Sequence, residues 1–257
     1  MFVSLGQWNT ESCLKAYCDA PTGISAPGLR AGGTADHVYG AISNWAVYHF
    51  NDTSPLASLR RDWPVRDRLE LRGNAENIAA FLLQLREKFQ DRYSLLKDTI
   101  RLIAPFFDDF VLEPESNGKG ETVRLEWHQN GSDFPFQPSQ FSDGTLRFIC
   151  LATALLQPDP PATIVVDEPE LGLHPYALSL LANLIESASE HTQIIVSTQS
   201  PQLLDHFQPE TVVIVRRQAG ESVFERLDTA ALHEWMEEYS VSELWRKNVF
   251  QGGPSHE

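Results

Sequence analysis

Two short apolar runs with a helical segment between them constrain the fold of this chain more than any other feature. Residues 162–167 (ATIVVD) and 193–197 (QIIVS) are continuous apolar runs rather than alternating ones. Such runs are typical of strands in a parallel sheet that helices cover on both faces. Helices are predicted over 144–156 and about 175–190, one ahead of each run. The alternation predicts an α/β fold with a parallel sheet core.

The chain before residue 141 follows a different pattern. Glycine and proline are frequent up to about residue 50, so we expect loops and short strands there. Beyond them, the spacing of Ile78, Phe81, Leu82 and Leu85 predicts an amphipathic helix, with Asn74 as its cap. The other expected elements are a helix with Tyr93, Leu96, Ile100 and Ile103 on one face, a hairpin around 117–120, strands over 211–217 and 222–227, and a tail helix holding Trp235 and Trp245.

Composition limits the partners of the chain. The formal net charge of −15 repels nucleic acid and anionic membranes on average, so a DNA contact would need a local basic patch or a partner chain. The one candidate patch, residues 59–72, mixes arginines with aspartate and glutamate, and we interpret it as a salt-bridged surface.

The three cysteines form no disulfide framework or zinc spacing, and the scattered histidines do not predict a metal site. The N-terminus lacks the features of a signal peptide, and the longest apolar run, 148–156, is less than half of a membrane span. We therefore expect a cytoplasmic protein without a membrane contact.

Asp167 and Glu168 follow the first apolar strand directly. The carboxyl ends of parallel strands are where ligands gather in such sheets. An aspartate there can hold Mg²⁺ through a water, and the next glutamate can deprotonate an attacking water. The alternative is an acidic turn after a buried strand.

Two other segments could face the same ligand. Ser142, Asp143, Gly144 and Thr145 open the helix before the strand, and free N–H groups with a helix dipole suit a phosphate there. The alternative is an ordinary N-cap. Polar residues 197–200 follow the second strand, where the alternative is a simple turn.

In this order, "FSDGTLRF" (141–148), "TIVVDEPELGLHP" (163–175) and "STQSPQLLD" (197–205) resemble the signature motif, the Walker B with D-loop, and the switch loop of RecF/SMC-like ABC-class ATPases. The resemblance implies a three-layer P-loop NTPase head with a parallel sheet core, a helical insertion and an incomplete N-terminal part. It divides the chain into a first-lobe remnant (1–140), the second half of the ATPase domain (141–227) and a helical tail (228–257).

The same resemblance implies roles for individual residues. Ser142 and Gly144 would contact the γ-phosphate of an ATP held by a second subunit, most simply in a homodimer, and Asp143 and Thr145 would belong to the same nucleotide-binding segment. Asp167 would serve Mg²⁺, Glu168 would be the general base, and Gly172, Leu173 and His174 would lie in the D-loop at the dimer interface. Gln199 stands where many relatives have a histidine, and its amide can donate a hydrogen bond but cannot take a proton.

The phosphate loop of such ATPases, G-x-x-x-x-G-K-[ST], does not occur in these 257 residues. The nearest match, residues 28–34, lacks the lysine that would meet the β- and γ-phosphates. In relatives the loop lies near the N-terminus, and we expect that this chain begins after it.

Two hypotheses of function follow from the resemblance and the missing loop. The first is ATP hydrolysis by a dimeric head that drives a DNA-related or defence process, with any DNA contact made by regions outside this chain. The second is a non-catalytic module that completes or regulates the site of a partner ATPase. A nuclease built on Asp108 and Asp109 is a third and poorer interpretation, because both lie between apolar residues before a predicted strand.

Overall fold

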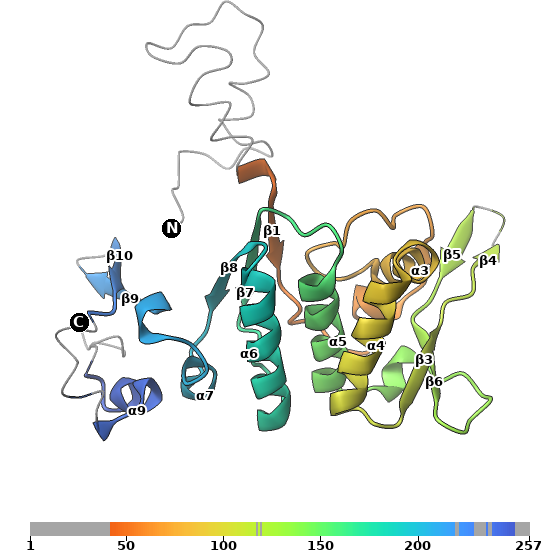
Figure 1. Cartoon of the computed structure of the whole chain (residues 1–257). Helices are drawn as coiled ribbons and strands as arrows, with labels where there is room; N and C mark the ends of the chain where they lie inside the picture. The colour runs from red at the N-terminus through yellow and green to blue at the C-terminus, as the bar shows by residue number, and fades with distance from the viewer. Residues whose placement is uncertain are drawn as a thin grey trace, which may run out of the picture.

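A three-stranded parallel sheet forms the centre of the computed structural model, which describes residues 42–116, 118, 120–218, 221–228, 235 and 238–249. Its strands are β1 (Trp45–Tyr48), β7 (Thr163–Asp167) and β8 (Gln193–Ser197), in the order β1-β7-β8. Both pairings are parallel, so the strands end at the same edge of the sheet. The predicted α/β fold with a parallel sheet core is confirmed (Figure 1).

Helices α5 (Asp143–Leu156) and α6 (Pro175–Ser189) share one hydrophobic core with the sheet. Ile164 and Val166 of β7 are buried in that core, as are most residues of α5. On the other face of the sheet, Trp45, Val47 and Ile195 are 45%, 58% and 43% exposed. In the part of the chain that is described, helix coverage of the sheet is therefore seen on one face, whereas the apolar pattern predicts it on both.

The helical insertion consists of α3 (Ile78–Lys88) and α4 (Gln90–Ile103), joined at Phe89. Ile103, which the sequence pattern also places on an apolar face, is half-buried, whereas the other predicted side chains are buried: Ile78, Phe81, Leu82, Leu85, Tyr93, Leu96 and Ile100. Helix α5 lies between α4 and α6, so the insertion covers the helical layer and not the sheet (Figure 1).

The prediction that Asn74 caps α3 is wrong. The helix begins at Ile78, and Asn77 stands at its N-cap position without a side-chain cap bond. The side chain of Asn77 is buried and bridges the preceding loop: Nδ2 donates to the carbonyls of Asp67 and Glu70, and Oδ1 accepts from the N–H of Arg72. Tertiary bonding has overridden the local capping preference.

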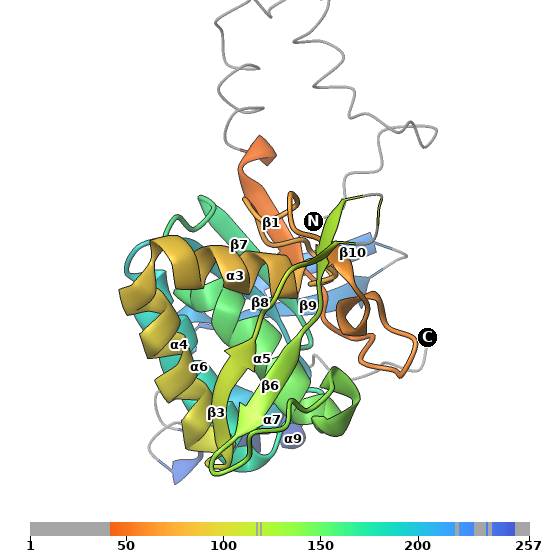
Figure 2. The ribbon, with the colours of Figure 1, turned by 90° about the vertical axis from the view of Figure 1, so that its right-hand side faces the viewer.

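Short antiparallel strands close the other side of the insertion. Strand β3 (Phe107–Val111) pairs with β6 (Glu126–Gln129), and β4 (Glu115–Ser116) pairs with β5 (Glu121–Val123), which also pairs with β2 (Trp63–Pro64). Figure 2 shows β3 and β6 side by side. The hairpin predicted around 117–120 is confirmed by the β4–β5 pair.

The C-terminal part forms a smaller unit. Strands β9 (Val213–Gln218) and β10 (Glu221–Arg226) make the two predicted late strands and pair antiparallel. The short α9 (Val241–Arg246) holds Trp245 and joins a second buried cluster made by Val212, Ile214, Leu227, Val241 and Leu244. Much of the tail predicted as helical before Tyr239 lies outside the described residues, as do residues 1–41.

Three short 3₁₀ helices, η1 (Ser58–Arg60), η2 (Pro138–Gln140) and η3 (Pro209–Thr211), and α7 (Pro201–Leu204) complete the elements of the described ranges. None of the helices in these ranges combines the length and apolar character needed to cross a membrane. The division at residue 140 stays a prediction, although the main buried cluster takes residues from both sides of it.

Replacing Asn77 by alanine removes three hydrogen bonds and takes this partner away from part-buried backbone groups of Asp67, Glu70 and Arg72. We expect Asn77→Ala to lower the free energy of unfolding by about 2 kcal/mol or more, measured by urea denaturation. The exposed Asn74, whose side chain bonds only to Glu76, is the matched control, and Asn74→Ala should cost less than about 1 kcal/mol. Equal effects of the two substitutions would contradict the bridging role of Asn77.

Candidate functional site

The carboxylate of Asp167 lies where the three parallel strands end. Oδ1 accepts a hydrogen bond from the Ser197 hydroxyl at the end of β8. Oδ2 lies 3.3 Å from Nδ1 of His49, the residue that follows β1. Sequence analysis missed His49, because only the parallel pairing of β1 with β7 brings these distant residues together. Each of the three strands thus contributes one polar side chain to this edge.

His49 is held in place by its surroundings. Its N–H donates to the carbonyl of Gly73 at 2.8 Å, and its Nε2 lies 3.1 Å from Nδ2 of Asn51. A Cβ at Gly73 would lie 2.6 Å from the carbonyl oxygen of Val47, so the close approach of the loop to β1 requires glycine there.

Glu168 adopts an uncommon backbone conformation and meets the switch segment. Its φ is 45°, in the left-handed region that few non-glycine residues occupy. Its N–H donates to the carbonyl of Ser197 at 2.9 Å, and Oε1 accepts from Nε2 of Gln199 at 2.9 Å. Burial raises the pKa of the Glu168 carboxyl, and the negative charges of Glu170 and Asp167 raise it further. The hydrogen bond from Gln199 lowers this pKa but does not cancel the increase. The structure therefore brings the two predicted catalytic residues into direct contact.

Glu170 is a second residue that the sequence analysis missed. Its Oε1 accepts three hydrogen bonds from residues 198–200, the segment that follows β8. The available signal was the third acid in "DEPE", which the local pattern assigned to an acidic turn.

Ser142 caps α5, which is the alternative to a phosphate contact that the sequence leaves open for this residue. Its Oγ accepts from the N–H of Thr145 at 3.1 Å and lies 2.8 Å from the Thr145 hydroxyl. Within the described residues, Ser142 makes no hydrogen bond to Asp167 or Glu168. If residues 142–145 bind a phosphate, they do so without a hydrogen bond from Ser142 to the two carboxylates of the same chain.

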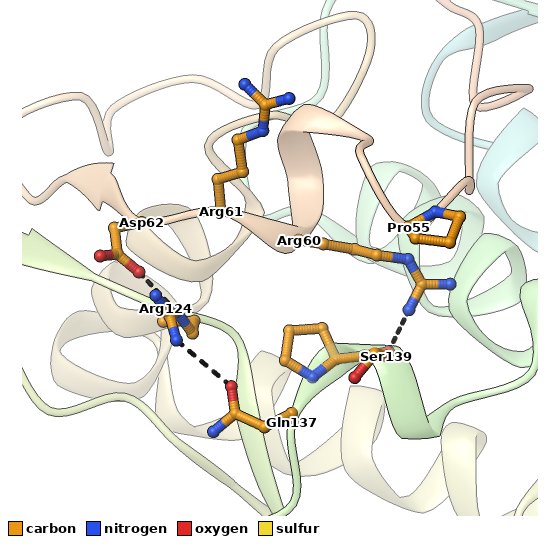
Figure 3. A pocket seen from close by; sticks show the side chains of 8 residues that line it. Pro55, Arg60, Arg61, Asp62, Arg124, Gln137 and Ser139 are labelled. Atoms are coloured by element: carbon orange, nitrogen blue, oxygen red, sulfur yellow. Dashed lines mark hydrogen bonds and ion pairs between the residues drawn. The ribbon is translucent and has the colours of Figure 1, made fainter.

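A cavity of about 500 Å³ opens beside the start of α5 (Figure 3). The side chain of Arg60 donates to the Thr53 and Pro138 carbonyls and, at 2.9 Å, to Oδ1 of Asp143. Arg124 pairs with Asp62 on the opposite wall, whereas the guanidinium of Arg61 points away. Ion pairs of Arg68 with Glu87 and of Arg72 with Asp67 complete the patch, in agreement with its interpretation as a salt-bridged surface.

Residues 172–174, which are predicted to form a D-loop, follow a turn that packs against α5. A Cβ at Gly144 would lie 2.3 Å from the carbonyl oxygen of Gly172, so the α5 backbone touches the D-loop backbone directly. Arg147 of α5 is buried, and its guanidinium donates to the carbonyls of Phe50, Asn51 and Leu171. Leu173 packs against the main core, and His174 caps α6 by accepting from the N–H of Tyr176 at 3.2 Å.

Asp108 and Asp109 are engaged in local structure. Asp109 accepts from the Tyr93 hydroxyl at 2.7 Å and from Nζ of Lys97 at 2.8 Å. Burial opposes ionisation of Asp109, but these partners hold its carboxyl pKa below its usual range. Asp108 lies 3.5 Å from Arg101. These contacts give a structural explanation for the pair and leave the nuclease interpretation without support.

The fold and site define a mixed α/β domain of the P-loop NTPase type, built like an SMC head. Residues 33–205 match the family described as "AAA domain, putative AbiEii toxin, Type IV TA system", and the chain belongs to this family of ATPase domains. No curated protein matches the chain in sequence.

Solved structures of SMC heads resemble the chain at low sequence identity. The SMC head bound to the C-winged helix domain of ScpA matches with a TM-score of 0.52 and 16% identity, over 77% of this chain and 63% of that one. An SMC structure described by ATP-driven dimerization and DNA-stimulated activation matches with a TM-score of 0.43 and 18% identity, over 61% and 94%. An SMC head from Pyrococcus furiosus, bound to the C-terminal domain of ScpA, matches with a TM-score of 0.47 and 18% identity, over 65% of this chain and 42% of that one. At these identities the likeness concerns the fold.

Gly144→Ala tests the contact between α5 and the D-loop. Alanine favours a helix over glycine by about 1 kcal/mol, whereas a forced shift of packed backbone costs roughly 1–3 kcal/mol. Because the added Cβ would meet a backbone carbonyl, we expect the steric cost to exceed the helix gain, with a lower urea midpoint. A higher midpoint for Gly144→Ala would show that the two backbones are not in contact.

Proposed function

We propose that the chain acts as an ATP-hydrolysing head that works as a dimer. The observation that carries the proposal is the contact of Glu168 with Gln199 beside Asp167, at the edge where the parallel strands end. Glu168 would take a proton from the attacking water, and the Gln199 amide would orient that water or the γ-phosphate. Membership in a family of ATPase domains supports the same reaction.

The residues around Asp167 fit a Mg²⁺ ion that is bound mainly through phosphates and water. No group of three or more histidine, cysteine, aspartate or glutamate side chains in the described ranges could enclose an ion. Mg²⁺ in nucleotide sites is commonly held by one or two carboxylates together with substrate phosphates. Asp167 would hold it through a water, with the Ser197 hydroxyl and His49 beside that water. Bound there, the ion would neutralise charge on the phosphates.

Electrostatics make such an ion necessary for nucleotide binding. Asp167, Glu168 and Glu170 lie within four residues, and the whole chain carries a formal charge of −15. Without a cation between the ATP phosphates and these carboxylates, ATP would be repelled from this edge of the sheet. ATP binding should therefore depend on a divalent cation.

The second subunit would supply a contact to the γ-phosphate, which this edge of the sheet lacks. Ser142 to Thr145 form the capped start of α5, with the N–H groups of its first turn directed outward along the helix axis. We propose that this segment meets the γ-phosphate of ATP held by the partner, with Gly172, Leu173 and His174 at the interface between subunits. DNA contacts would come from regions outside this chain, because the arginines of residues 59–72 that pair with acids are already neutralised.

The second candidate function is a module that completes the site of a partner ATPase. It is favoured by one observation, that G-x-x-x-x-G-K-[ST] does not occur in the 257 residues. The two functions are separated by equilibrium binding of ATP with Mg²⁺ to the purified chain. Saturable binding without any partner supports the first function, and binding only when a partner ATPase is added supports the second.

Glu168→Gln tests the proposed base. General-base catalysis contributes roughly 10²- to 10⁴-fold, so we expect turnover of ATP to fall by about 100-fold or more while ATP binding persists. Glu186→Gln, on the exposed face of α6, is the matched control and should leave turnover unchanged. Unchanged turnover in Glu168→Gln would remove this residue from the role of base.

Asp167→Asn tests the metal site through binding as well as activity. With preformed Mn²⁺–ATP as the probe, the change in its electron paramagnetic resonance spectrum on adding the protein reports binding, because ATP alone already removes the free-ion signal. Removing the carboxylate charge should weaken Mn²⁺ binding by about tenfold or more. Equal Mn²⁺ affinity in Asp167→Asn and the wild type would contradict the assignment of Asp167.

A further inference from the structure

One oxygen of the Glu170 carboxylate gathers the segment that follows β8. Oε1 accepts from the Thr198 hydroxyl at 2.5 Å, from the N–H of Gln199 at 3.2 Å and from the N–H of Ser200 at 3.1 Å. The Thr198 hydroxyl in turn accepts from the Ser200 N–H at 3.0 Å. The backbone N–H groups of Gln199 and of the next residue, Ser200, are therefore both bonded to a single side chain.

The bonds to Glu170 decide where the Gln199 side chain points. Gln199 is itself exposed, so its position is not set by burial in a core. Its amide nevertheless donates to Oε1 of Glu168 at 2.9 Å, while its backbone N–H is held by Glu170. We propose that Glu170 is a positioning residue, which holds residues 198–200 so that the Gln199 amide meets Glu168. Its importance for catalysis rests on the proposed function.

Glu170 also belongs to the turn that leads into the D-loop. The N–H of Leu173 donates to the Glu170 carbonyl at 3.0 Å, and the N–H of Leu171 donates to the Glu168 carbonyl at 3.3 Å. The same residue thus carries backbone bonds of the D-loop turn and side-chain bonds of the switch segment. A displacement of the D-loop would move Glu170 and, through it, Gln199. Glu170 therefore connects the proposed subunit interface to the proposed catalytic pair.

The second oxygen of Glu170 shows which substitution preserves this geometry. Oε2 is buried and has no hydrogen-bond partner among the described residues. A glutamine at this position keeps an acceptor of the same shape for the three donors, and its amide nitrogen would lie where Oε2 now lies. Alanine removes the acceptor altogether. Glu170→Gln should therefore rescue the arrangement that Glu170→Ala destroys.

The test is backbone amide exchange, measured residue by residue by NMR in the full chain without nucleotide. Because an exposed amide is protected mainly by its hydrogen bond, Glu170→Ala should accelerate exchange of the Gln199 and Ser200 amides by about tenfold or more. Glu170→Gln should leave both rates within about threefold of the wild type. Glu186→Ala is the matched control and should change neither rate. Unaltered exchange at Gln199 and Ser200 in Glu170→Ala would overturn the proposal.

A second readout distinguishes positioning from general support of the fold. The side-chain amide signals of Gln199 should shift in Glu170→Ala toward those of Glu168→Ala, in which the amide has lost its partner, and should return in Glu170→Gln. The amides of β7 and β8 should keep their wild-type exchange rates. Gln199 signals that stay at their wild-type positions in Glu170→Ala would overturn the proposal even if the loop exchanges faster.

If Glu170→Ala does not fold, Thr198→Val takes its place. It removes one donor to Glu170 and one of the two acceptors of the Ser200 N–H, so exchange of Ser200 should accelerate. Unchanged exchange of Ser200 would count against the network. None of these measurements uses ATP, so loss of the proposed ATPase function would leave the positioning role of Glu170 standing, and the reverse also holds.

Discussion

Asp167 and Ser197 are register partners at the ends of two neighbouring parallel strands. On the other side of β7, Tyr48 pairs with Val166, so that His49 follows at the level of Asp167. Because the strands are parallel, all of them end at one edge of the sheet. The pairing of the backbones alone therefore brings these three residues to the same level. The contacts of Asp167 with Ser197 and His49 depend on that register, and a shift by one residue would turn Asp167 to the opposite face of the sheet.

Beside this edge, one buried side chain holds two loops through their backbone groups. Arg147 is buried, yet its guanidinium meets three carbonyl oxygens from two loops and no carboxylate among the described residues. Burial accordingly lowers the pKa of Arg147, although a guanidinium stays charged at any physiological pH. Five N–H donors in a fixed plane can reach several carbonyls at once, which a lysine ammonium cannot match in geometry. The side chain of Arg147 thus joins α5 to the loop after β1 and to the turn at Leu171.

How much of this was predictable from the sequence depended on the range of the interactions involved. The apolar runs of β7 and β8 and the helical spacing of α3 to α6 are local patterns, and the predicted elements agree with the structure. The assignment of Glu168 and Gln199 as catalytic residues followed from the order of three motifs that resemble those of a known kind of ATPase, and their direct contact is seen only in the structure. His49, Glu170 and Asn77 were missed or misjudged, because each acts through partners that only the folded chain brings near. The Asn74 cap failed for the same reason, since Asn77 bonds to three backbone groups of the preceding loop.

The left-handed conformation of Glu168 shows how this network bears on chemistry. A non-glycine residue at a φ of 45° costs about 1 kcal/mol or more and persists only where its surroundings impose it. Here the Glu168 N–H is fixed to Ser197, and the turn that follows is fixed through Glu170 to residues 198–200. The backbone is thus constrained on both sides of the residue, and the carboxylate is held against Gln199 while burial and like charges disfavour its ionisation. Under the proposed function, a carboxylate held in place at this cost would accept a proton from a water that the neighbouring amide orients, and a relaxed acidic turn would have neither the constraint nor the contact.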